Sequence, residues 1–243
     1  MPVPQRDTFP GRKLADYQRF REDLAEEWTR RQAEAIKSAD PLALVTVGLI
    51  QWSVPVLLAG PSQYSGFRPQ RLAPLLDFME VHFYPLARGF YEYTEPEDEA
   101  RNLAYLESVV REVARCGRPT VLAEFGWYGG GKPTINEGKH PFATEEQQAQ
   151  WCRRAIETTA GLAGGWLNWG FYDHPGARDV TEFIGLLTAD GELKAWGKAF
   201  REIATRFHDH GLPAPKPLDR PNPDWDKLIT DRKAVSEFRE KYY

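Results

Sequence analysis

The sequence has little cysteine, no surplus of positive charge and no long apolar run. Its two cysteines, Cys116 and Cys152, lack metal-ligand spacing, so we expect core or free thiols and no metal site. A formal net charge of −4 without a lysine–arginine cluster argues against a nucleic-acid partner. No apolar stretch is long enough to cross a membrane. No signal peptide opens the sequence, so a cytoplasmic location is expected if the chain is complete.

Aromatic residues are abundant instead. They make up 13% of the 243 residues and include 8 tryptophans, which is typical of clefts that stack sugars on indoles and also of an aromatic core. The 42% hydrophobic and 27% charged residues indicate a globular protein with one sizeable domain, with or without an appendage.

Apolar runs alternate with helical patterns along most of the chain. We expect strands over 42–49, 54–58, 78–85, 119–124 and 165–171. We expect helices over 14–38, 69–76, 94–115, 144–162 and 194–207. This order predicts an α/β fold with a parallel sheet of about four to five strands and flanking helices, too few strands for a closed eight-stranded barrel.

The ends of the chain differ from this alternating part. The first helix is expected to carry one apolar stripe, formed by Tyr17, Phe20, Leu24, Trp28 and Ile36. Prolines concentrate after Gly211, so we divide the chain into a domain over 1–211 and a proline-rich linker with a short C-terminal helix over 212–243.

Glu124 is the leading candidate for a functional residue. The run from Pro119 to Ala123 is apolar or β-branched, which predicts a strand buried on both faces, and it ends in this single carboxylate. Aromatic side chains follow directly. Because a buried carboxylate is costly and chemistry gathers at the carboxyl ends of parallel strands, Glu124 is a site candidate; the plain alternative is a solvent-facing glutamate.

Polar and aromatic groups gather at the ends of the expected strands. They are Trp52, His82, Tyr84, Trp127, Tyr128, Trp166, Trp169 and Asp173. A carboxylate among histidine, tyrosine and tryptophan suits glycosidic chemistry, in which an anion faces the anomeric carbon and aromatic rings support the sugar.

Five segments in the right order resemble the C-terminal half of a cellulase-type glycoside hydrolase, of the family 5 type, from the retaining TIM-barrel clan. The resemblance runs from about Leu14 to Phe207 through the segments 40–48, 81–85, 122–126, 165–169 and 185–196. It implies a half barrel without strands one to four, Glu124 as the nucleophile, His82 and Tyr84 lining the site, and a tryptophan of the segment 165–169 beneath the sugar. It implies no metal and no organic cofactor.

The general acid of that family would lie on a strand that this sequence lacks. Three residues are alternatives for the role: Glu80, which shares a strand face with His82; Glu137, in the loop after the nucleophile strand; and Asp173, which is equally suited to binding a sugar hydroxyl.

A half barrel exposes sheet edges and inner strand faces. We therefore expect a homo-oligomer, a dimer that completes the barrel or covers its edges; cover by the terminal segments, or a longer natural chain, are the alternatives. The expected function is hydrolysis of a carbohydrate substrate. The other hypotheses are a vestigial half barrel that binds carbohydrate without turnover, and a half domain that needs a separate N-terminal half.

Overall fold

The computed structural model describes residues 11–54, 64–85, 96–134, 140–214 and 220–242. The chain divides into two compact units. Unit 1 holds residues 1–81, 107–121 and 217–243, and unit 2 holds residues 82–106 and 122–216.

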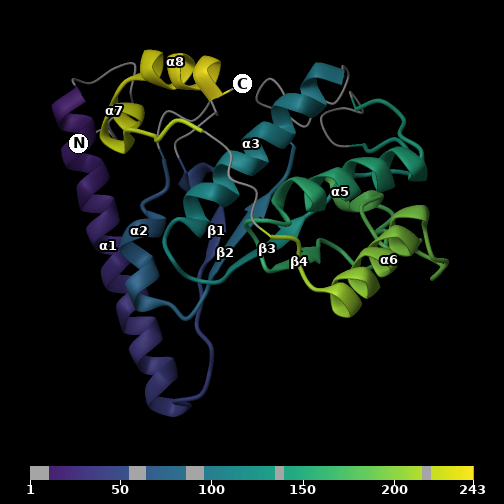
Figure 1. Ribbon diagram of the computed structural model, residues 1–243, viewed down its shortest axis with the longest axis horizontal. Helices are drawn as coiled ribbons and strands as arrows, with labels where there is room; N and C mark the ends of the chain where they lie inside the picture. Colours follow the sequence, from purple (N-terminus) through teal and green to yellow (C-terminus); the bar gives the residue numbers. More distant parts are fainter. Residues whose placement is uncertain (1–10, 55–63, 86–95, 135–139, 215–219, 243) are drawn as a thin grey trace. The chain divides into compact units, whose positions relative to one another are not determined.

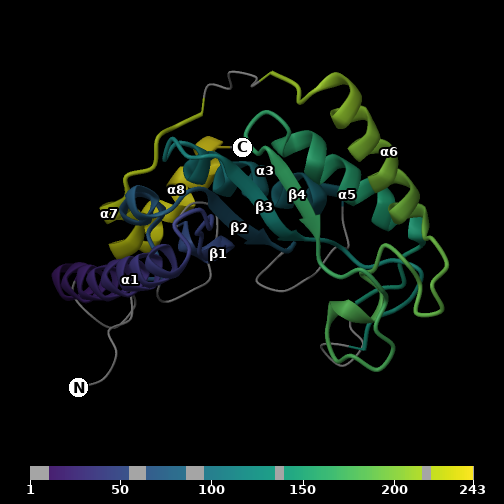
Figure 2. The same ribbon diagram turned by 90° about the horizontal axis from the view of Figure 1, so that it is seen from below.

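The central element is a parallel sheet flanked by helices, which confirms the expected fold class. Its four strands are β1 (Gly48–Ile50), β2 (Met79–Phe83), β3 (Thr120–Phe125) and β4 (Gly165–Asn168). They neighbour one another in sequence order, β1-β2-β3-β4, and Figure 2 shows their arrows. Because the strands are parallel, each connection must return to the same end of the sheet, and helices occupy the connections between them.

Unit 1 is built around the longest helix. Its helical elements are α1 (Gly11–Ala39), η1 (Gln51–Ser53), α2 (Pro69–Leu72), η2 (Ala73–Leu75), the second half of α3 (Pro96–Ala114), α7 (Trp225–Thr230) and α8 (Arg232–Tyr242). Helix α1 packs against α2, η2 and α7 (Figure 1). The Tyr242 hydroxyl donates to the buried Glu107 carboxylate, which fixes the end of α8 to α3.

Unit 2 holds α5 (Glu145–Thr159), η3 (Val180–Glu182), α6 (Ala195–His210) and the first half of α3. Helices α5 and α6 pack side by side and bury Trp151, Cys152 and Trp196 almost completely (Figure 1). Helix α5 begins with the capping box that the sequence predicts, in which Thr144 and Gln147 exchange hydrogen bonds between side chain and backbone.

The face that α1 buries is not the apolar stripe. The buried positions are Leu14, Gln18, Glu22, Ala25, Thr29 and Ala33. Phe20, Leu24 and Trp28 are 55%, 56% and 50% exposed. The buried polar groups on this face form hydrogen bonds. The Gln18 side-chain amide, for example, donates to the Ser65 carbonyl oxygen at 2.9 Å.

The first expected strand is much shorter than its apolar run. The prediction of a strand over 42–49 was wrong for residues 42–47, which are not in a strand; Leu42 and Leu44 are 90% and 73% exposed. Hydrogen bonds join Val45 and Asp77 there without forming a ladder. Of the strand expected over 54–58, Val54 is described and is not in a strand, and the rest lies outside the described residues.

Strands β2 and β3 are each buried on one face and half-buried on the other. Both cysteines are free, as expected, with Cys152 on α5 and Cys116 just after α3. Within the described ranges, no helix has the length and apolar character needed to cross a membrane.

Candidate active site

Three of the residues singled out in the sequence meet at the ends of β2 and β3, within unit 2. The Tyr84 hydroxyl donates to Glu124 Oε2 at 3.2 Å. His82 Nδ1 lies 3.2 Å from the same oxygen. The carboxylate of Glu124 is therefore held from one side by two neighbours from the adjacent strand.

The strand pattern explains this meeting. Along β2, Met79, Val81 and Phe83 are buried, so His82 projects from the half-buried face, and Tyr84 follows on the same side. Along β3, the alternation breaks: two successive residues, Ala123 and Glu124, are both half-buried.

The next residue along β3 returns to the buried face. The ring of Phe125 packs edge-on against Trp196 of α6. Because successive side chains of a strand point to opposite faces, this strand end packs a phenyl ring against α6 while the preceding carboxylate contacts His82 and Tyr84.

The site is partly open to solvent. The side chains of Glu124 and His82 are 25% and 22% exposed. In the described part of the chain, both recorded polar contacts of Glu124 involve Oε2, so Oε1 is the oxygen available to an incoming group. A carboxylate that is oriented but accessible in this way suits either nucleophilic attack or anion–hydroxyl recognition.

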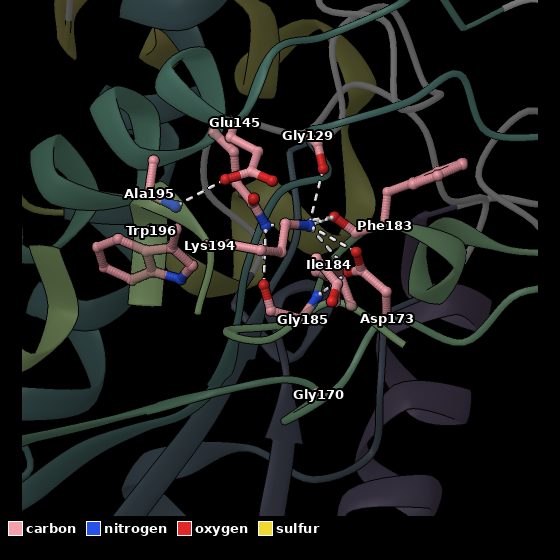
Figure 3. Close-up of polar contacts among 12 residues, drawn as sticks. Gly129, Glu145, Gly170, Asp173, Phe183, Ile184, Gly185, Lys194, Ala195 and Trp196 are labelled. Carbon is pink, nitrogen blue, oxygen red and sulfur yellow. Dashed lines mark hydrogen bonds and ion pairs between the residues drawn. The ribbon is translucent and has the colours of Figure 1, made fainter. Parts of the chain in front are cut away.

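A buried lysine supports the loops that follow β3 and β4. Lys194 is 1% exposed, and its ammonium donates to the carbonyl oxygens of Gly129 (2.7 Å) and Phe183 (2.9 Å) and to both carboxylate oxygens of Asp173 (2.9 Å each). Figure 3 shows the ammonium between these three partners. Burial raises the pKa of Asp173 and lowers that of Lys194, each opposed by the attraction between the two.

The Asp173 carboxylate therefore bonds to groups of the protein itself. One of its oxygens also accepts a hydrogen bond from the Gly185 backbone amide at 2.8 Å. A Cβ on Gly185 would lie 2.3 Å from the Asp173 nitrogen, so this close approach of two chain segments needs glycine. Asp173 is a candidate for sugar binding or for the general acid, but its carboxylate already bonds a lysine ammonium and a backbone amide. The sequence alone did not reveal these two contacts.

Glu145 joins the starts of two helices in the same region. It is the first residue of α5, and its Oε2 accepts from the backbone amide of Ala195, the first residue of α6, at 2.8 Å (Figure 3). Carboxylates are favourable at helix N-termini because unpaired amides and the helix dipole meet them there.

The tryptophans at the end of the sheet fall into two groups. Trp169, just past β4, is 46% exposed, and its backbone amide donates to the Phe125 carbonyl at the end of β3. Trp166 points toward the helices instead, where its Nε1 donates to Thr159 Oγ1 at 2.8 Å and its ring lies over Phe207. Of these two indoles, Trp169 offers the more open face beside the carboxylate strand.

Trp127 and Tyr128, two of the aromatic candidates from the sequence, are buried. They are 2% and 1% exposed and pack against each other and against Trp151 and His140. The Tyr128 hydroxyl donates to the Pro141 carbonyl oxygen at 2.9 Å. Both rings hold the loop after β3 in place, because loop residues fold back over them.

The remaining candidates are Glu80, Trp52 and Glu137. Glu80 is half-buried on the same face of β2 as His82, two residues earlier, and belongs to unit 1. Trp52 is 39% exposed in η1, also in unit 1. Glu137 lies outside the described residues. Among the side chains that are described, no group of three or more histidine, cysteine, aspartate or glutamate residues is arranged to hold a metal ion.

Comparison with solved structures gives the fold a broader setting. A GH5_18 protein from Streptomyces cattleya, in complex with Manb1-4GlcNAc, is similar over 90% of this chain and 53% of its own, with a TM-score of 0.61 and 21% identity. A β-D-glucuronidase from Dictyoglomus thermophilum matches 74% of this chain and 29% of its own (TM-score 0.55, 20% identity).

A β-glucuronidase from Ruminococcus gnavus, in complex with D-glucuronic acid, is similar over 74% of this chain and 30% of its own (TM-score 0.53, 20% identity). The fold is a partial TIM barrel, similar to part of the barrels of these glycosidases. Because proteins described as GH5_18 and as glucuronidases both match, the likeness does not single out glycoside hydrolase family 5. No protein-family model and no curated protein matches the chain.

The chain spans about half of the GH5_18 protein and less than a third of the glucuronidases. Lys194 is the residue of this region that sequence reasoning missed. Its only signal was its place just before the last helix of the resemblance, where a lone lysine gives no hint of burial.

Proposed function

We propose that this chain is a glycoside hydrolase that acts on β-linked glycosides by a retaining mechanism, with Glu124 as the nucleophile. The observation that carries the proposal is the contact of both His82 and Tyr84 with Glu124 Oε2, at the end of β3 in a glycosidase-like fold. Glu124 attacks the anomeric carbon and displaces the aglycone, and water then hydrolyses the glycosyl–enzyme ester.

The two neighbours act by orienting the nucleophile. The Tyr84 hydroxyl and His82 occupy Oε2, so that Oε1 is left to attack. A carboxylate fixed by hydrogen bonds loses less freedom in reaching the transition state, and this is how positioning lowers a barrier.

The leaving oxygen needs a proton from a second carboxyl about 5–5.5 Å from the nucleophile. Glu80 and Glu137 are the proposed donors: Glu80 for its place on the His82 face of β2, and Glu137 for its position in the loop that follows the nucleophile strand. A homodimeric partner is a further source of this group, as proposed from the sequence.

The proposed substrate is a β-hexoside. Trp169 is the proposed aromatic platform because the residue is 46% exposed and its backbone amide bonds the Phe125 carbonyl oxygen at the end of β3. Trp52 is already exposed and keeps its proposed sugar contact. The other proposed sugar contacts require the groups around them to rearrange first; these are the contacts of Trp127, Tyr128, Trp166 and Asp173. The solved relatives bound D-glucuronic acid and Manb1-4GlcNAc, so glucuronides and mannosides belong among the sugars to test first.

The test uses aryl β-glucuronides, β-mannosides and β-glucosides with the wild type, Glu124→Gln and the matched control Glu146→Gln, which changes an exposed glutamate on α5. Activated aryl leaving groups need little protonation, so a competent nucleophile turns them over even with a weak acid. We expect turnover that Glu124→Gln abolishes and Glu146→Gln retains. Incubation with a 2-fluoro glycoside should add one glycosyl mass to the wild type only at Glu124.

Absence of turnover and of the covalent adduct would refute the hydrolase. The second candidate function, carbohydrate binding without turnover, is favoured by the accessible Glu124 carboxylate and the open Trp169 face. It predicts sugar-induced quenching of tryptophan fluorescence that Trp169→Ala abolishes. A half domain that needs a separate N-terminal half would show neither property until that half is added.

A further inference from the structure

Helix α1 exposes a row of large apolar side chains along one face. Phe20, Leu24 and Trp28 are four residues apart, which places them one above another on an α-helix. Each is at least half exposed. Phe20 lies on the side of α1 opposite to the polar groups that unit 1 buries, and the row turns from there toward the groove beside Trp28. Exposed apolar rows of this kind on a soluble domain mark interaction surfaces.

The row borders a hollow in unit 1. A groove of about 630 Å³ is lined by Leu24, Trp28 and Phe67 together with Arg21 and Glu27. The ring of Trp28 stands edge-on to Phe67 at a centroid distance of 5.8 Å, so one edge of the indole is fixed while the rest faces outward. The surface is therefore shaped as well as apolar, with rigid aromatic anchors of the type that dominate interfaces.

The charged residues beside the row can pair with the same residues of a second copy of α1 that runs in the opposite direction. In a two-fold antiparallel pairing with Leu24 opposite Leu24 of the partner subunit, Phe20 lies opposite Trp28 of the partner subunit. On the flank of the row, Arg31 then lies next to Asp16 of the partner subunit. Lys13 similarly lies next to Glu34 of the partner subunit. The symmetry repeats both contacts, which gives four attractive pairs.

We infer that this face of α1, formed by Phe20, Leu24, Trp28 and their charged flank, is the self-association surface of the protein, and that its occupant is α1 of a second copy in antiparallel orientation. Asp16, Arg31 and Glu34 now pair with neighbours on their own helix and are 59%, 71% and 63% exposed. Such exposed pairs are worth little, so exchanging them for pairs across the interface costs little. The apolar row supplies the affinity, and the charges select the antiparallel register.

The experiment measures the mass of the full chain by sedimentation equilibrium. We expect the wild type to be a dimer and Leu24→Glu to raise the dissociation constant by about a hundredfold or more, because two like charges meet at the two-fold axis. The matched control is Leu42→Glu, since Leu42 is 90% exposed and lies outside α1. It should dimerise as the wild type does. A monomeric wild type, or a Leu24→Glu variant as dimeric as the control, overturns the inference.

A charge exchange tests the register itself. Arg31→Glu and Asp16→Lys should each weaken the dimer by about tenfold, and the double variant should restore it, because the pairs across the interface are re-formed with opposite signs. Circular dichroism confirms that each variant keeps its helix content. If the double variant is no tighter than either single variant, the antiparallel arrangement is wrong.

Discussion

Lys194 and Asp173 form an ion pair in which both carboxylate oxygens lie 2.9 Å from the lysine ammonium nitrogen. The lysine also binds the carbonyl oxygens of Gly129 and Phe183. One buried cation thereby fixes loops that follow β3 and β4, the two strands that carry Glu124 and lead to Trp169. The geometry of the candidate site depends on a residue that does not touch it.

Replacing Lys194 by methionine should therefore destabilise the protein strongly. Loss of one partner leaves Asp173 buried without its cation and two carbonyl groups without a donor, which costs about 3–5 kcal/mol. Urea unfolding followed by circular dichroism measures this loss. Lys198→Met, at an exposed position in the first turn of the helix that follows Lys194, is the control and should change the free energy of unfolding by less than about 0.5 kcal/mol. Equal behaviour of the two variants would contradict the role of the ion pair.

Tyr84→Phe should lower kcat by about tenfold to a hundredfold and leave KM nearly unchanged, since the hydroxyl orients Glu124 and the ring remains. This expectation rests on the proposed hydrolase activity. Steady-state kinetics on the best aryl glycoside gives the two constants. Tyr17→Phe, on α1 and remote in sequence, is the control for loss of a tyrosine hydroxyl. An unchanged kcat in Tyr84→Phe would show that this hydrogen bond does not contribute.

Alkaline conditions should weaken the fold through Tyr128. Burial raises the pKa of this phenol from 10.0 to about 12. Between these values the unfolded chain has lost a proton that the folded chain keeps, so the free energy of unfolding falls as pH rises through this range. Tyr128→Phe should be less stable at neutral pH, by about 1 kcal/mol for the lost bond to Pro141, but should show a flatter alkaline decline.

Urea titrations at a series of alkaline pH values compare the two proteins. Tyr172→Phe, which changes a tyrosine that is 53% exposed, is the control for the loss of a tyrosine hydroxyl. A Tyr128→Phe protein with the same alkaline slope as the wild type would refute the assignment.

The two thiols should differ in reactivity. Burial and the nearby Glu112 raise the pKa of Cys116 to about 11, so at about pH 8 only on the order of one thiolate in a thousand is present. Cys152 is fully buried. We expect iodoacetamide to modify Cys116 slowly, faster as the pH rises, and Cys152 only in urea, as read by peptide mass spectrometry. Rapid labelling of Cys152 in the native protein would contradict its burial.

The centre of the candidate site was predictable because it depends on local rules. Alternation along a strand places His82 and Tyr84 on one side, and a carboxylate at the end of a parallel strand indicates chemistry. In the structure, the Tyr84 hydroxyl and His82 Nδ1 each lie 3.2 Å from Glu124 Oε2, while the roles of the three residues remain a proposal. Their partners in the surrounding loops were not predictable, because contacts such as Lys194 with Gly129 join residues far apart in the sequence, and only packing decides them.

Helix α1 shows the other limit of sequence reasoning. Its periodic pattern identified the helix almost to its ends, but periodicity says only that two faces differ. The usual assumption that the apolar face is the buried one fails here, because Gln18, Glu22 and Thr29 find hydrogen-bonding partners inside unit 1. Hydrogen bonds of these polar side chains help to determine which face of α1 is buried, and a sequence pattern does not show those bonds.

Glu145 has a consequence for the motions of unit 2. One carboxylate lies in the first turn of α5 and accepts from the first amide of α6, so neither helix start opens without disturbing the other. The early amides of the two helices should then exchange with solvent as one cooperative unit, although 50 residues separate them in the chain. A single side chain would thus make the thermal fluctuations of two helices correlated events.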